Sequence, residues 1–326
     1  MNIHPVEDLG TLRAFHAVEA ATADHDYVAL PADPIDELVP LLDGRPRAGD
    51  LTLLRLGTDG GTPVGTLTLS LPLLDNLGAA NLEVHVHPAH RRRGHGRALL
   101  EAALAEVTAQ GRTRVFGQAP WGPDETDGPA FGLLRSLGFR QVLDDYRRLL
   151  DLTASPLGAP LDPPQGYRVV QWLDRAPDGL VDGAAYLLGR MTLDAPMGEM
   201  DYEQEKWDAA RLRAKEQDCI ERNRLRVATC VVHEATGAVA GLTEIGVNRA
   251  RTTVAYQWDT IVDPDHRGQR LGLVLKSWNH RHLVDQVPEV AYVNTWNAAS
   301  NTYMIAVNEA LGFRPAERWS EWQLDL

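Results

Sequence analysis

The sequence contains one motif twice, and this repeat restricts the possible folds more than any other feature. Residues 88–100 read PAHRRRGHGRALL, and residues 264–276 read PDHRGQRLGLVLK. Further along, SLGFR at 136–140 is matched by ALGFR at 310–314 at nearly the same offset. Matched segments at one spacing are the signature of an internal repeat. We therefore expect two copies of one supersecondary unit.

The length and the distribution of prolines agree with two copies. The chain has 326 residues, more than a single hydrophobic core usually holds. Between the copies, residues 151–166 read DLTASPLGAPLDPPQG, and proline removes backbone donors and restricts the residue before it. The sequence predicts an N-terminal domain over 1–153, a proline-rich linker over 154–166 and a C-terminal domain over 167–326.

Composition limits the classes of function. Hydrophobic residues make up 44% and charged residues 24%, which is ordinary for a globular protein. The net charge of −13 argues against a nucleic-acid partner, because duplex binders usually carry a basic face. The two cysteines, Cys219 and Cys230, form no disulfide or metal framework. With no leader-like start and no apolar run of membrane-spanning length, we expect a cytoplasmic monomer or homodimer without a membrane partner.

Periodicity predicts the same order of elements in both copies. Alternating and helical patterns indicate hairpin strands followed by strand, loop, helix, strand, helix and strand, which is an α/β (α+β) class with a mixed sheet. In the first copy these are helix 6–23, strands 51–56, 63–71 and 82–87, helix 94–109, strand 113–118, helix 129–137 and strand 141–150. In the second they are a polar helix 199–222, strands 225–233, 238–246 and 253–262, helix 271–284, strand 290–295, helix 301–311 and strand 317–325. We expect strand 141–150 to complete the sheet of the first copy and strand 317–325 to complete the sheet of the second.

Each copy places a glycine- and arginine-bearing loop between a strand and a helix. The first free N–H groups of such a helix and its dipole favour an anion. Glycines allow close approach, and arginines add charge-assisted hydrogen bonds. The loop matches neither the Walker pattern nor the dinucleotide fingerprint. In the first loop, 91–96, all three features coincide, and a diphosphate is a natural occupant. In the second loop the side chain of Arg270 can either obstruct a phosphate or contact it.

These residues carry a family resemblance. The pattern of Arg91, Gly94 and Gly96 after a strand ending in V-x-P, with LGF about forty residues later, resembles motif A of the GNAT superfamily of N-acetyltransferases. The second copy matches at Arg267 and Gly272 but has Arg270 at the middle glycine. The resemblance implies two tandem GNAT-like domains that bind acetyl-CoA or another acyl-CoA. The coenzyme-binding residues that it implies are Val84, Val86, Arg91, Arg92, Arg93, Gly94, His95 and Gly96, and Val262, Arg267, Gly268, Arg270, Gly272 and Asn301.

The groups that would move protons depart from the family pattern. The family usually has a tyrosine that protonates the thiolate, and the equivalent positions here are Asn308 and Leu134. Asn308 can still donate a hydrogen bond to the thiolate, whereas Leu134 cannot. For the proton acceptor the candidates are Asp259 and Glu244 in the second copy, with Glu83 equivalent to Asp259 in the first. For Glu83 a solvent-facing strand residue is the favoured interpretation, and for Asp259 a structural role and a catalytic role are equally open.

The sequence therefore predicts an N-acyltransferase in which a small amine attacks the thioester directly. We expect chemistry in the second half, at Asp259, Glu244 and Asn308, and acetyl-CoA as a structural ligand in the first. The alternative is a non-catalytic scaffold that binds an acyl-CoA or a metabolite, because both tyrosines are missing. No metal is expected, since the histidines are divided between strand and loop: His85, His87, His90 and His95.

Overall fold

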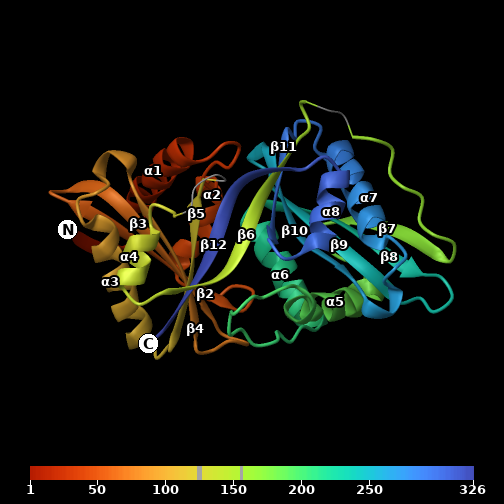
Figure 1. Cartoon of the computed structure of the whole chain (residues 1–326), viewed down its shortest axis with the longest axis horizontal. Helices are drawn as coiled ribbons and strands as arrows, with labels where there is room; N and C mark the ends of the chain where they lie inside the picture. The colour runs from red at the N-terminus through yellow and green to blue at the C-terminus, as the bar shows by residue number, and fades with distance from the viewer. Residues whose placement is uncertain (123–126, 155–156) are drawn as a thin grey trace. The chain divides into compact units, whose positions relative to one another are not determined.

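The structure, a computed structural model, describes residues 1–122, 127–154 and 157–326 (Figure 1). Two residues of the predicted linker, 155–156, lie outside the described part. The chain divides into two compact units that do not follow its order. The first unit contains Met1–Tyr146, Met197–Glu203 and Glu317–Leu326, and the second contains Arg147–Pro196 and Gln204–Ala316.

The sheet of the first unit runs in the order β1-β2-β3-β4-β5-β12. Neighbours are antiparallel except β4 and β5, which are parallel. Parallel pairing requires a crossover, and the helix after the first loop provides it. The strands are β1 (Asn2–Pro5), β2 (Asp50–Asp59), β3 (Thr62–Pro72), β4 (Ala79–Val86), β5 (Arg114–Trp121) and β12 (Arg314–Asp325).

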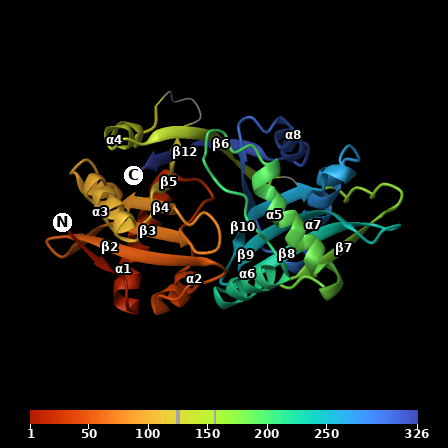
Figure 2. The ribbon, with the colours of Figure 1, turned by 90° about the horizontal axis from the view of Figure 1, so that it is seen from below.

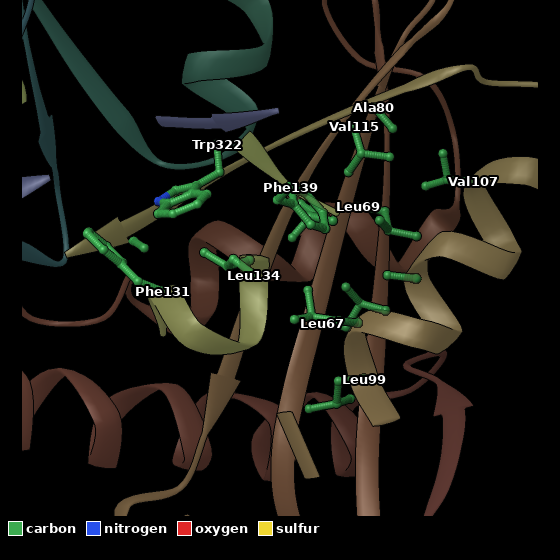
Figure 3. Close-up of a cluster of buried hydrophobic side chains, with 14 of the residues drawn as sticks. Leu67, Leu69, Ala80, Leu99, Val107, Val115, Phe131, Leu134, Phe139 and Trp322 are labelled. Atoms are coloured by element: carbon green, nitrogen blue, oxygen red, sulfur yellow. The ribbon is translucent and has the colours of Figure 1, made fainter. Parts of the chain in front are cut away.

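Helices cover both faces of this sheet. Figure 2 shows α1 (Leu9–Asp26) and α2 (Ile35–Leu38) on one side and α3 (His95–Ala109) and α4 (Phe131–Ser136) on the other. The side chains of α3 and α4 that face the strands are apolar and pack in one core (Figure 3). Short 3₁₀ turns, η1 (Val39–Asp43) and η2 (Pro88–His90), precede β2 and the first loop.

The second unit repeats this plan, with the order β6-β11-β10-β9-β8-β7. Here β10 and β11 are the parallel pair. The strands are β6 (Arg140–Asp151), β7 (Tyr167–Leu173), β8 (Arg224–His233), β9 (Val239–Asn248), β10 (Arg251–Val262) and β11 (Tyr292–Ala298). The helices are η3 (Asp178–Leu180), α5 (Val181–Asp194), α6 (Ala209–Glu221), η4 (Pro264–His266), α7 (Leu271–Gln286) and α8 (Thr302–Ala310).

The last strand of each copy does not close its own copy, so that expectation is wrong. β12 pairs with β5 of the first unit, from Arg318 opposite Trp121 to Asp325 opposite Arg114. The part of β6 from Arg147 onwards belongs to the second unit and neighbours β11. The physical reason is packing: Trp322 is buried in the first core, and Leu150 of β6 is buried in the second. The domain bounds 1–153 and 167–326 stay a prediction. The compact units differ from them by these exchanged strands and by Met197–Glu203, which belongs to the first unit.

The prediction of a long polar helix over 199–222 is wrong for its first half. α6 begins at Ala209, and the Asp208 side chain caps it by accepting from the Arg211 backbone N–H. Met197–Glu203 belongs instead to the first unit, where Arg114 donates a hydrogen bond to the Asp201 carbonyl. Within the described residues, no helix combines the length and apolar character needed to cross a membrane.

Candidate active site

The two loops have the same backbone geometry, although glycine and arginine occupy opposite positions in them. In the first loop Arg92 and Gly94 have φ angles of 62° and 85°, and at the equivalent positions Gly268 and Arg270 have 79° and 60°. A non-glycine residue in this left-handed region costs about 1–2 kcal/mol. Arg270 therefore keeps the turn that a glycine would make, and its exposed side chain remains free to meet an anion.

One arginine of each loop is used to hold the loop in place. Nε of Arg91 donates to the Val86 carbonyl at 3.0 Å, and Nε of Arg267 donates to the Val262 carbonyl at 3.2 Å. Arg91 also donates to both carboxylate oxygens of Asp26, at 2.9 and 2.6 Å. Arg267 lies 3.0 Å from the carboxylate of Asp194. The first loop is therefore tied to the C-terminal end of α1 and the second loop to the C-terminal end of α5.

The pKa of each partner carboxyl reflects this pairing. Partial burial by itself raises the pKa of Asp26, but the hydrogen bonds from Arg91 outweigh it and leave the pKa lowered. The pKa of Asp194 is lowered in the same way by Arg190 and Arg267. The guanidinium groups left for an anion are Arg92, Arg93 and Arg270, which are exposed.

Both helices after the loops begin without a side-chain cap. The N-cap residues are Gly94 for α3 and Arg270 for α7, and neither offers a side-chain acceptor. By contrast, Asp8 caps α1 and Asn301 caps α8. An uncapped N-terminus leaves backbone N–H groups without an intrahelical partner, which is the basic requirement for an anion site.

The side chains of several predicted coenzyme residues are engaged within the fold. Val84 and Val86 pack against the first core, and Val262 packs against a core cluster under α7. His95 is buried, with Nε2 3.8 Å from the carboxylate of Asp59. Asn301 accepts from the Met304 N–H at 3.1 Å, so its amide oxygen is engaged as a cap.

The strands that lead into the loops separate from their parallel neighbours. Among the described residues, the pairing of β4 with β5 runs from Ala79 to Leu82 and stops there. The pairing of β10 with β11 runs from Val254 to Tyr256. The last residues of both strands therefore present backbone groups that a ligand can pair with.

β10 also contains a bulge that β4 lacks. Gln257 pairs with Ile245 and Thr260 pairs with Thr243, so Trp258 and Asp259 together face Glu244. The Gln257 side chain fastens the bulge by donating to the Glu244 carbonyl at 2.8 Å. A bulge re-aims the side chains next to it.

Asp259 and Glu244, the two carboxylates predicted for the second half, both lie within ion-pair distance of one ammonium group. Nζ of Lys215 is 3.3 Å from Oδ2 of Asp259 and 3.5 Å from Oε2 of Glu244. Glu244 also forms a buried ion pair with Arg226. Burial by itself raises the pKa of Glu244, but the charges of Arg226 and Lys215 hold it below its usual value. Glu244 is fully enclosed, whereas the Asp259 side chain is 28% exposed.

Asn308 is locked inside the second unit. Its Nδ2 donates to Asn297, and its Oδ1 accepts from Nζ of Lys276. Lys276 is buried, and burial lowers its pKa to about 7. The predicted donor to the thiolate is thus already engaged, while Leu134 in the first unit is buried in the core as expected of an apolar residue.

Two groups near the loops were not predicted from the sequence. The Tyr303 hydroxyl lies 3.6 Å from where a Cβ on Gly272 would stand, at the N-terminus of α7. The equivalent neighbour of Gly96 is the Leu133 side chain, also at 3.6 Å. The signal available in the sequence was a tyrosine two residues after the cap Asn301.

The second unpredicted group is Glu19 of α1. It accepts a hydrogen bond from Thr66 at 3.1 Å, and burial raises its pKa to about 7. Thr66 pairs with His85 across β3 and β4, and the exposed Glu83 lies on the same face of β4. The described residues contain no grouping of three or more His, Cys, Asp or Glu side chains suited to a metal ion.

The mixed sheet, its separated parallel pair and the uncapped helix that follows agree with the acetyltransferase class that the motif resemblance implied. The sequence model of the acetyltransferase (GNAT) family matches residues 20–139 and again residues 194–313. The chain belongs to this family, and the two matches make it a tandem GNAT N-acetyltransferase.

Relatives of known name agree with this assignment. The chain is 30% identical over 301 residues to a mycothiol acetyltransferase of Salinispora tropica, covering 89% of this chain and 85% of the relative. It is 33% identical to the mycothiol acetyltransferase of Thermomonospora curvata, covering 90% and 87%. Among solved structures, a tandem GNAT protein from the clavulanic acid biosynthesis pathway has 29% identity and a TM-score of 0.83, covering 99% and 98% of the two chains.

Proposed function

We propose that this chain transfers an acetyl group from acetyl-CoA to the amine of a small molecule. The observation that carries the proposal is the pair of uncapped helix N-termini, each entered through a loop with two left-handed residues. Such a terminus suits the coenzyme diphosphate. A small-molecule acceptor is supported by the relatives, whose printed name is mycothiol acetyltransferase.

The reaction is a direct attack. The neutral amine nitrogen forms a bond to the thioester carbon and the carbon–sulfur bond breaks. The extra proton on the nitrogen passes, directly or through solvent, to the departing thiolate, and coenzyme A leaves as the thiol. An ammonium ion must first lose a proton, and we assign its acceptance to Asp259, which is the exposed carboxylate of the pair. Glu244 and Asn308 are buried and paired, so we assign them positioning roles: Glu244 orients Lys215 beside Asp259, and Asn308 joins α8 to α7.

We place the chemistry in the second half and a structural coenzyme in the first. The bulge at Trp258 and Asp259 and the Tyr303 hydroxyl beside Gly272 support this division. The first half has a regular β3–β4 pairing, and the side chain beside Gly96 is the apolar Leu133. Glu19 is the proton acceptor to consider if the division is reversed, since its pKa of about 7 suits a general base.

Gly96→Glu and Gly272→Glu form a matched pair of variants that tests the proposal. At both positions a Cβ would meet only side-chain atoms at 3.6 Å or more, and neither glycine has a positive φ. Each glutamate would place a carboxylate at one anion site and repel the diphosphate. Native mass spectrometry counts acetyl-CoA per chain, and thioester consumption over a panel of amines measures turnover.

We expect two coenzymes bound to the parent chain, one to each variant, and loss of turnover only in Gly272→Glu. Loss of turnover only in Gly96→Glu would move the chemistry to the first half. A parent chain that binds acetyl-CoA but consumes no thioester with any amine of the panel would favour the scaffold alternative, and a chain that binds no acetyl-CoA would refute the coenzyme assignment.

A further inference from the structure

The second unit encloses one of its own ammonium groups in a cage of aromatic and acidic side chains. Nζ of Lys215 lies over the rings of Trp207 and Trp258, 5.4 and 5.9 Å from their centroids. The same atom is 3.3 Å from Asp259 and 3.5 Å from Glu244. Aromatic faces and carboxylates are the groups that recognise alkylammonium ions. We call these four residues, Trp207, Trp258, Glu244 and Asp259, the ammonium cage.

Both rings of the ammonium cage are held in place by their surroundings. The Trp258 ring occupies the space beside Gly246, where a Cβ would stand 2.0 Å from the ring. The Trp207 indole N–H donates to Oε2 of Glu205 at 2.7 Å, and the Arg211 guanidinium lies over the same ring at 4.5 Å. The cage is therefore a preformed feature of β9, β10 and the segment just before α6, and it does not depend on where Lys215 points.

The charges show which carboxylate depends on Lys215. Glu244 already forms a buried ion pair with Arg226. Among the described residues, Asp259 forms its ion pair with Lys215. Burial by itself lowers the pKa of Lys215, but Asp259 and Glu244 raise it above its ordinary value. Lys215 is thus kept as an ammonium ion, which is a poor nucleophile, and it fits the role of an occupant better than that of an acetyl acceptor.

We propose that the ammonium cage is the subsite for the ammonium group of the acceptor in the second half, and that Lys215 occupies it until the acceptor displaces it. This inference rests on the proposed function, because it takes Asp259 as the carboxylate that faces the acceptor amine. The side chains of Lys215 and Asp259 are 23% and 28% exposed, so the cage is reachable from solvent. The ligand class is a primary alkylammonium ion.

Removal of the resident cation tests the proposal without any turnover. n-Butylammonium chloride is titrated into Lys215→Ala while tryptophan fluorescence is followed, with sodium chloride at equal ionic strength as the blank. We expect a saturable change in Lys215→Ala and an at least tenfold weaker response in the parent chain. Adding Asp259→Asn to Lys215→Ala is expected to weaken binding at least tenfold. Lys215→Ser is measured in parallel, so that a folding defect of one variant does not decide the result.

The matched control is Arg222→Ala, which removes a cation beside Asp218 at the far end of α6 and leaves Lys215, Arg211 and both rings in place. It should respond like the parent chain. The proposal is overturned if folded Lys215 variants bind n-butylammonium no better than Arg222→Ala, or if Asp259→Asn leaves their affinity unchanged. Because acetyl-CoA is absent from this titration, failure of the proposed transfer reaction would leave the binding result standing.

Discussion

The indole ring of Trp322 meets the phenyl ring of Phe131 edge to face, with 4.8 Å between the ring centroids (Figure 3). Trp322 lies on β12, at the end of the sequence, and Phe131 begins α4 of the first copy. Both side chains are buried in one core with α3. The first unit is therefore completed by a strand that the chain supplies last.

Trp322→Ala should destabilise the first unit strongly. Loss of a large buried aromatic side chain costs about 3–5 kcal/mol of unfolding free energy, because it removes apolar contact and leaves a cavity. Urea unfolding measures the change. Trp319→Ala is the control, since Trp319 is half-buried and stacks on Tyr27 at 5.7 Å, and a smaller loss is expected. Equal losses would contradict the central place of Trp322 in this core.

A chain that ends at residue 153 should lack cooperative unfolding. It would leave the edge of β5 unpaired and the core without Trp322. An unpaired, apolar edge also promotes aggregation. Size-exclusion chromatography and thermal unfolding measure both effects, and a synthetic peptide of residues 314–326 should restore a cooperative transition. A monomeric fragment that unfolds cooperatively without the peptide would show that the exchanged strand is dispensable.

Asp26→Asn should weaken coenzyme binding at the first loop. The asparagine cannot accept the paired, charge-assisted hydrogen bonds that Arg91 donates, so the loop is held less firmly. We expect about a tenfold rise in the acetyl-CoA dissociation constant, from a loss of about 1.5 kcal/mol. Calorimetry in the Gly272→Glu background isolates this loop. Asp24→Asn, at an exposed position of the same helix, should bind as before.

Tyr303→Phe should weaken coenzyme binding at the second loop. The variant removes only the hydroxyl beside Gly272, and one lost hydrogen bond of about 1 kcal/mol corresponds to roughly fivefold in affinity. Calorimetry in the Gly96→Glu background reports this loop alone. Tyr186→Phe, an exposed tyrosine of α5, serves as the control. Identical affinities for the two variants would mean that the hydroxyl does not touch the coenzyme.

The buried Lys276 should make stability depend on pH. Burial lowers its pKa from 10.5 to about 7 in the folded chain. Between these values the unfolded chain binds a proton that the folded chain lacks, so the free energy of unfolding rises with pH by up to about 1.4 kcal/mol per unit. Lys276→Met should remove this rise between pH 7 and 10, as urea unfolding measures. Lys206→Met should keep it, and a parent chain with a flat profile would refute the shift.

The order of elements and the loops were predictable because they depend on short-range rules. Strand alternation and helical spacing indicated β4, α3, β10 and α7, and the glycines and arginines indicated where the backbone turns into a helix. The roles of individual side chains were harder to predict from the sequence. Arg91 and Arg267 look alike in the sequence whether they meet a phosphate or a carboxylate, and the partners Asp26 and Asp194 lie far away along the chain.

The sequence by itself determined that the chain holds two copies of one α/β unit and that in each copy a loop with glycine and arginine leads into a helix, because both follow from local pattern and spacing. Only the tertiary structure decided which strand completes each unit, since β6 and β12 have similar alternation and the choice depends on which core buries Leu150 and which buries Trp322. It also decided that Lys215 lies between Asp259 and Glu244. That contact joins a helix to two strands, and long-range packing sets it where no local pattern can.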